Sequence, residues 1–351
     1  RSSQEVPPPK STTPARGAGA PEPRGMSQPS MEPDQSECRF ELEDGVAWQE
    51  YLRTHGYVVI ANVADPAEGR DLFWRFMEGR YRMSRDDPST WFTDSWPAEP
   101  GTGIFFSDTG VCHTQFMWWA RTRPKVKQAF ASLWHTEDLL VSYDGAGVMR
   151  PWHRDGCEDA KTSGGWFHVD QNPHFKPDLT CIQGMVSMYD ANVTMGGFSV
   201  IPYSHDELFQ GPVKDSYPRS AGDFHVVPGR IINDARPSRL VPCRAGDLTL
   251  WDSRTLHCNE PAWTTPAAPD NELLRLVAYV CMLPTSRTSI SVRKRRLLAY
   301  RQRVGSNHWP TETRYCLGPA NTPEPNDGLD IGEEGMALVT GLEARELVLG
   351  A

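Results

Sequence analysis

The sequence has no long apolar run. No stretch approaches the roughly 18 residues that a membrane-spanning helix needs, so we expect no membrane span. It also has no excess of positive charge, because its 36 Lys and Arg are outnumbered by 45 Asp and Glu, and basic runs such as residues 293–296 are short. We therefore expect no nucleic-acid partner, since phosphate binding needs a basic face.

Cysteine is sparse and dispersed. The chain has 8 Cys in 351 residues, and no two of them form a Cys-x-x-Cys pair. This spacing excludes the common zinc and redox motifs and a small disulfide-stapled domain. We expect a cytoplasmic or another reduced intracellular compartment. The sequence starts at Arg1 without a secretory apolar segment, so this expectation holds only if no targeting segment has been removed.

What is present suffices for one large folded unit, because 38% of the residues are hydrophobic. Residues 1–37 are rich in Pro, Ser, Gly and Ala, and a segment of this composition cannot repay the entropy of ordering, so we expect a disordered leader. We expect residues 38–317 to form a single domain. Residues 318–351 are acidic and contain Pro, which indicates a mostly irregular tail.

The folded part begins with helical patterns and continues with short strands. Apolar spacing predicts helices over residues 44–56, 65–79, 123–135 and 291–303. The second opens with Asp65 as N-cap, Pro66 at the first helical position and Glu68 placed to close a capping box. Residues 84–115 read as a loop. Short β-branched runs separated by Gly and Pro predict strands within residues 56–63, 138–145, 166–171, 180–191, 196–202, 239–243, 246–252 and 273–283. Together these patterns indicate an α+β protein with a mainly β core, a sandwich, jelly roll or barrel.

Two His-x-Asp pairs stand out, His153 with Asp155 and His168 with Asp170. Residues two apart on a strand share a face, so either pair could bind one metal ion. Two His and one carboxylate on one face of a metal form the facial triad of non-haem iron oxygenases. His257, in "GDLTLWDSRTLHCNEP", is a candidate for the third ligand.

We favour the second pair. His168 and Asp170 alternate with the apolar Phe167 and Val169 in "WFHVDQ", so a strand would hold both ligands rigidly. The first pair lies in a polar, loop-like stretch, which leaves His153 as a residue beside the ligands, a substrate-facing residue or a plain surface residue.

A co-substrate carboxylate at such a metal would need a fixed cation at its far end. Arg275 begins the apolar strand "RLVAYVCML", and a guanidinium binds a carboxylate bidentately. The plainer alternatives are that Arg275 pairs with a neighbouring acid, that His257 is a hydrogen-bonded core residue, and that His168 and Asp170 lie on a surface strand.

The motifs "LLVSYDGAGVMRPW", "GWFHVDQNP", "CIQGMVSMYDA", "GGFSVIPYSHDELF", "GDLTLWDSRTLHCN" and "LRLVAYVCMLP" occur in one order along the chain. In this order the sequence resembles the phytanoyl-CoA dioxygenase-like group of Fe(II)/2-oxoglutarate-dependent oxygenases, especially its algal and fungal branch. The resemblance covers roughly residues 40–315. It departs from the common pattern in "PYSH" at residues 202–205 and in a longer gap between His257 and Arg275, which requires residues 261–272 to loop out.

The resemblance implies a double-stranded β-helix, a cupin-like jelly roll with flanking N-terminal and C-terminal helices. It implies Fe(II) bound by His168, Asp170 and His257, and 2-oxoglutarate anchored by Arg275 and lined by Gln183 or Met185. It further implies a dioxygenase that uses O2 to hydroxylate an aliphatic C–H bond of a small-molecule or lipid-like substrate, with release of succinate and CO2.

Two other functions fit the same residues. One is a non-catalytic jelly-roll protein that binds a metal or small ligand. The other is a cupin-type isomerase or hydrolase that uses zinc or manganese and needs no O2.

Overall fold

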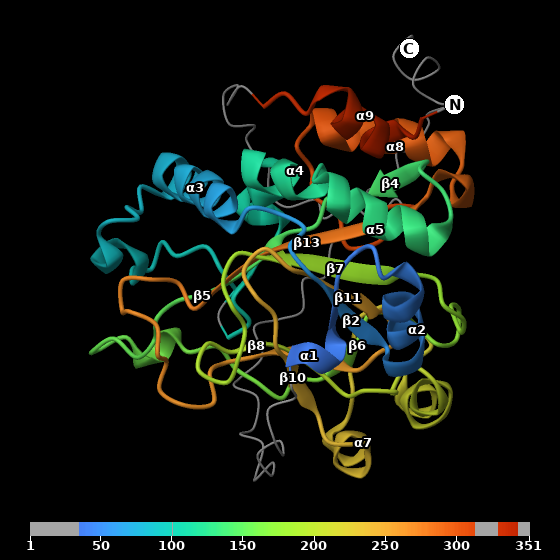
Figure 1. Ribbon diagram of the computed structural model, residues 1–351, viewed down its shortest axis with the longest axis horizontal. Coiled ribbons are helices and arrows are strands. Elements are labelled where there is room, and N and C mark those ends of the chain that lie inside the picture. Colours follow the sequence, from blue (N-terminus) through green and yellow to red (C-terminus); the bar gives the residue numbers. More distant parts are fainter. Residues whose placement is uncertain (1–34, 100, 313–328, 343–351) are drawn as a thin grey trace, which may run out of the picture.

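The computed structural model describes residues 35–99, 101–312 and 329–342 and shows two β-sheets packed face to face, with helices stacked on the larger sheet (Figure 1). The larger sheet has the order β1-β2-β11-β7-β13-β5-β3, with β4 also paired to β13, and the smaller sheet has the order β10-β8-β12-β6-β9. Most pairs are antiparallel, and β1 with β2 is parallel. The prediction of a mainly β jelly-roll core is confirmed.

The strands of the larger sheet are β1 (Arg39–Phe40), β2 (Tyr57–Ile60), β3 (Ile104–Phe105), β4 (Leu139–Val141), β5 (Ala146–Met149), β7 (Ile182–Ser187), β11 (Leu248–Asp252) and β13 (Arg275–Pro284). Those of the smaller sheet are β6 (His168–Val169), β8 (Gly197–Val200), β9 (His225–Val226), β10 (Arg239–Val241) and β12 (His257–Glu260).

The helices are α1 (Gln35–Cys38), α2 (Gly45–His55), α3 (Pro66–Phe76), α4 (Gln115–Arg121), α5 (Pro124–Trp134), α6 (Lys214–Ser216), α7 (Gly229–Asp234), α8 (Ile290–Arg301) and α9 (Gly332–Thr340). Helices α3, α4, α5, α8 and α9 form a layer on the side of the larger sheet that faces away from the smaller one (Figure 1). In the described part of the chain, every helix is too short or too polar to cross a membrane.

The interior between the sheets has its own apolar cluster. Tyr57, Met185 and Trp251 from the larger sheet meet Phe198 and Val200 from the smaller one. A separate cluster, with Phe167 and Val169, covers the outer face of the smaller sheet. Side chains on each strand therefore alternate between two buried environments, which leaves few polar positions along the strands.

The four predicted helices are present, and the predicted cap of the second is confirmed because the Asp65 side chain accepts a hydrogen bond from Ala67 N at 2.9 Å. Glu68, the expected capping-box partner, has its Oε2 3.7 Å from Arg123 Nη1. Helix α4 and strand β5 were not predicted. Phe116–Arg121 is buried all round, so it has no polar face to reveal a helical period, and β5 is built from small residues, including Gly147.

The two ends of the domain differ from expectation. Residues 1–34 of the predicted leader lie outside the described residues, but Gln35–Cys38 forms α1, and Cys38 is buried in the interior cluster. Within the predicted, mostly irregular tail, Gly332–Thr340 forms the helix α9. Leu338 and Val339 of this helix join the core, since apolar burial outweighs the acidic composition around them.

The N-terminal segment is tied to the larger sheet by a buried carboxylate. Asp247, fully buried before β11, accepts hydrogen bonds from Arg39 Nε at 2.8 Å and Nη2 at 3.0 Å. It also accepts the backbone N–H groups of Asn62 and Arg244 at 3.0 and 2.8 Å. Four donors therefore offset the cost of burying this charge.

We predict that Arg39→Met lowers the free energy of unfolding by roughly 3 kcal/mol, because it leaves a buried carboxylate without its cation. Urea unfolding followed by circular dichroism measures this change. Arg53→Met is the control, since the Arg53–Glu50 pair is exposed and should change stability little. Equal losses in the two variants would contradict the assignment.

Candidate metal centre

Strand pairing brings two distant histidines together. In the antiparallel β6–β12 pair, His257 stands directly opposite His168, so both imidazoles project from the same face into the interior. Their ring centroids are 4.2 Å apart. The sequence-distant His257 therefore joins His168, as predicted.

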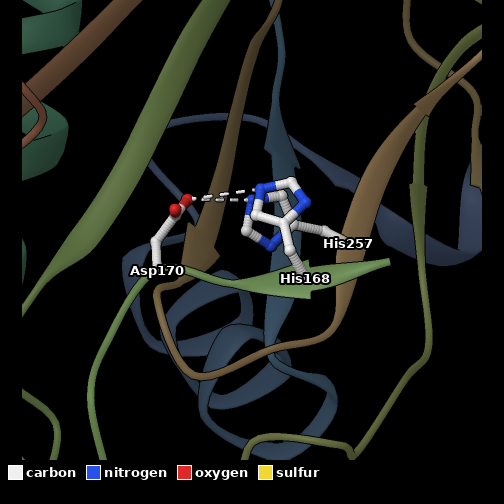
Figure 2. A group of neighbouring side chains, drawn as sticks. All are labelled: His168, Asp170 and His257. Carbon is white, nitrogen blue, oxygen red and sulfur yellow. Dashed lines mark ion pairs between the residues drawn. The ribbon is translucent and has the colours of Figure 1, made fainter. Parts of the chain in front are cut away.

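Asp170 completes the group (Figure 2). Its Oδ2 lies 3.6 Å from His168 Nε2 and 3.2 Å from His257 Nε2, and the three ligand atoms lie within 4.8 Å of one another. The predicted strand over residues 166–171 is shorter than expected, because β6 ends at Val169 and Asp170 sits in the bend that follows. Its backbone is held there by the hydrogen bond from Asp170 N to Ser253 O at 3.0 Å.

The hydrogen bonds around the triad orient its ligand atoms. Nδ1 of His168 lies 3.3 Å from Trp166 O, and Nδ1 of His257 lies 2.8 Å from Thr255 O. A carbonyl only accepts, so each Nδ1 donates to it and each Nε2 faces Asp170, where it is placed to bind a metal ion. Gln183 on β7 donates from Nε2 to Asp170 Oδ2 at 2.9 Å and fixes the carboxylate.

The protonation of these groups suits a cation. Burial lowers the pKa of His257, and the neighbouring His168 lowers it further, so this imidazole is neutral at neutral pH. Burial opposes charge on Asp170, but the imidazoles of His168 and His308 outweigh it and hold the pKa of this carboxyl well below its usual range. A carboxylate and neutral imidazoles are the forms that bind metal ions.

The other His-x-Asp pair is not part of this group. His153 lies in the turn after β5 and its Nε2 is 3.1 Å from Ala268 O, while Asp155 is exposed. Among the residues that the structure describes, His168, Asp170 and His257 are the one cluster of three side chains spaced to hold a metal ion.

Arg275 lies on the same interior face. It is 4% exposed, donates from Nη1 to Asn259 Oδ1 at 2.7 Å, and has Nη2 3.1 Å from Met185 Sδ. No carboxylate in the described part of the chain lies within ion-pair distance of it. Arg275 therefore forms no structural ion pair with a described residue. A buried guanidinium without an anionic partner is suited to bind an anion.

Gly147 on the neighbouring strand β5 lets two polar side chains approach the backbone closely. A Cβ at this position would lie 2.8 Å from Tyr279 Oη and 3.3 Å from Arg275 Nη1. Tyr279, on β13, is only half-buried although it faces the interior. Tyr279 Oη and Arg275 Nη1 thus meet beside the Gly147 backbone, a place called here the Gly147 cradle.

Two bridges connect this cradle to the triad. Asn259 follows His257 by two positions on β12, and Met185 follows Gln183 by two on β7, so each pair shares a face. One bridge leads from His257 through Asn259 to Arg275. The other leads from Asp170 through Gln183 and Met185 to Arg275.

Sequence reasoning missed several supporting residues. Asn259 could have been found because it follows His257 by two positions, and Tyr279 because it follows Arg275 by four, so that each shares a strand face with a predicted site residue. His308 could not, because it lies beyond α8 in a segment without periodicity, yet its Nε2 donates to Asp170 O at 3.1 Å. Ser253 is likewise set by tertiary contact alone.

The donor set fits iron with a chelating carboxylate co-substrate. Two imidazoles and one carboxylate on one side of a shared point match the facial arrangement that non-haem iron enzymes use and that leaves room for other ligands. Arg275, which has no carboxylate partner among the described residues, is suited in charge and geometry to bind a second carboxylate of such a co-substrate.

Comparison with known proteins gives a family match over the part of the chain that contains this site. Residues 52–264 match the family model described as phytanoyl-CoA dioxygenase. "Ava biosynthesis cluster protein O" of Aspergillus versicolor is 30% identical over 68% of this chain and 77% of its own length. A "Putative phytanoyl-CoA dioxygenase" of Dictyostelium discoideum is 23% identical over 59% of this chain and 68% of its own length.

Solved structures share less sequence. SnoN, described as a non-heme alpha ketoglutarate dependent epimerase from nogalamycin biosynthesis, is 20% identical, with a TM-score of 0.43 over 69% of this chain and 80% of that one. The family match covers well over half of the chain and includes all three triad residues. The chain therefore belongs to the phytanoyl-CoA dioxygenase family of iron- and 2-oxoglutarate-dependent oxygenases.

Proposed function

We propose that the protein hydroxylates an aliphatic C–H bond of a small-molecule or lipid-like substrate, with Fe(II) bound by His168, Asp170 and His257. The observation that carries the proposal is the presence, within one interior, of a metal-binding triad and of a buried arginine that has no carboxylate partner among the described residues. A protein that only binds a metal has no use for that second, costly feature.

The triad residues bind and orient the metal. The carbonyls of Trp166 and Thr255 accept from the two Nδ1 atoms and orient the two Nε2 atoms toward the metal, and Gln183 holds the carboxylate. When bound, iron and 2-oxoglutarate supply the oxidising chemistry, in which O2 is reduced, 2-oxoglutarate is decarboxylated to succinate and CO2, and a C–H bond is hydroxylated. The chain itself contributes positioning and exclusion of water.

Arg275 anchors the distal carboxylate of 2-oxoglutarate in this proposal. Asn259 accepts one of its N–H groups and fixes the guanidinium plane, and Met185 packs beside it. Gln183, which the family resemblance places along the co-substrate, also donates to Asp170. Met185 keeps the lining role, since its Sδ contacts Arg275.

We predict that His168→Ala abolishes the weak visible charge-transfer band that forms when Fe(II) and 2-oxoglutarate are added without O2. Loss of a direct ligand should weaken metal binding by more than the roughly 10- to 100-fold known for residues that only support ligands. His153→Ala is the matched control and should keep the band. If both variants behave alike, the ligand assignment is wrong.

We predict that Arg275→Met raises the KM for 2-oxoglutarate about 10- to 100-fold, the loss expected for one charged hydrogen-bonding partner. The readout is succinate released by slow turnover without prime substrate. Arg236→Met, which removes an exposed guanidinium resting on Tyr203, should leave KM unchanged.

Two outcomes of the same assay would contradict the function. Absence of succinate under every condition would favour a binding protein. Turnover that needs zinc or manganese and no O2 would favour an isomerase or hydrolase.

A further inference from the structure

We propose that Trp166, Phe224 and Val226 form the wall of the substrate site, called here the β9 wall, and that it holds an uncharged aromatic or fused-ring substrate. This inference rests on the proposed function and names the substrate class of the same site. It assigns specificity to side chains that do not themselves hold the metal.

The β9 wall lies directly beside a metal ligand. Val226 stands opposite His168 in the β6–β9 pair, so the two side chains share the interior face. Trp166 precedes His168 by two positions and stacks on its ring at 4.9 Å with an interplanar angle of 6°. The Phe224 ring approaches the same imidazole at 4.8 Å.

These side chains are exposed where the rest of the interior is closed. Phe224 is 55% exposed and Val226 is 47% exposed, whereas Phe198 and Trp251 on the same interior face are 3% exposed. Strand β9 is the edge strand of the smaller sheet. Exposed apolar side chains next to a reactive centre mark a binding surface, because leaving them in water is unfavourable.

The backbone that presents Phe224 is held firmly. Tyr217 Oη donates to Gly222 O at 2.8 Å and to Asp223 O at 2.6 Å. The Asp223 carboxylate accepts from Lys176 Nζ at 2.8 Å and from Asn172 N at 3.2 Å. The exposure of Phe224 is therefore a fixed property of the fold.

The pairing of β9 with β6 also keeps Phe224 and Val226 on the interior face. Val227 N donates to Phe167 O at 2.9 Å, and Val227 and Phe167 pack in the outer cluster of the smaller sheet. Because side chains alternate along a strand, Phe224 and Val226 lie on the face opposite to Val227. They cannot turn outward unless the register of β9 shifts by one residue.

The chemistry of the β9 wall favours rings over charged groups. The indole Nε1 of Trp166 already donates to Ser163 O at 3.0 Å, so only its π face is available. Phe224 and Val226 add no polar atom. Lys176, the cation on the adjoining segment, is paired with Asp223 and with Glu312 at 2.6 Å. A ring stacks on such a surface, whereas the phosphates of an acyl-CoA would need free cations.

The test uses 2-naphthol as a fused-ring probe with the full chain. With Mn(II) at the triad, we expect the naphthol proton signals to broaden, because the probe lies near the paramagnetic ion. Phe224→Ala should weaken naphthol binding about five- to tenfold, the loss expected from one aromatic pair. Phe224→Trp should retain the binding. Leu298→Ala, an exposed apolar residue on α8, is the control and should change nothing.

Calorimetry of naphthol with the metal-free chain gives the same comparison without metal or turnover, so failure of the proposed function leaves this test standing. The proposal is overturned if naphthol does not bind, if it binds equally to Phe224→Ala, or if it binds without broadening. It is also overturned if octanoyl-CoA binds more tightly than naphthol and is insensitive to Phe224→Ala. Sedimentation that shows a dimer lost in Phe224→Ala would assign the β9 wall to self-association instead.

Discussion

The site depends on the register of one strand pair. His168 and His257 meet because β6 and β12 are antiparallel and these two residues are direct partners. A shift by one residue would turn one imidazole to the outer face, where Phe167 and Val169 now pack. The register is secured on the other side of β12 by a four-residue ladder with β8, in which His257 faces Val200. The metal-binding geometry is therefore a consequence of apolar packing on both faces of the smaller sheet.

The other polar groups of the site lie two positions apart along their strands, and therefore on the same face as the triad. Asn259 comes two residues after His257, and Met185 comes two residues after Gln183, so both lead along the interior toward Arg275. Polar atoms in such an apolar interior are stable only when each has a partner. Arg275 has Asn259 as a partner but no carboxylate within the described part of the chain, and its guanidinium lies beside the Gly147 backbone. The large apolar core on both sides of the sheet stabilises the fold and offsets the cost of burying this guanidinium without an anion.

Much of this arrangement could be predicted from sequence. The mainly β core, the helices around residues 44–56 and 291–303, and the preference for His168 over His153 follow from periodicity and residue chemistry. Helix α4 could not be predicted, because burial on all sides removes the periodic signal. The roles of Ser253 and His308 could not either, since both act through backbone carbonyls brought close only by tertiary folding. The acidic composition near residue 332 hid α9, whose Leu338 and Val339 reach the core.

Strand β9 belongs to the long segment between β8 and β10, lies at the edge of the smaller sheet and pairs with β6. Its outward side chains are anchored, but Phe224 and Val226 face open space, so exchanging them would create neither a cavity nor a buried unpaired group. Substitutions at these two positions should therefore change the free energy of unfolding little, whereas substitutions on the buried strand β12 should lower it. Over evolutionary time, relatives could therefore diverge in what they oxidise while inheriting the same iron chemistry unchanged.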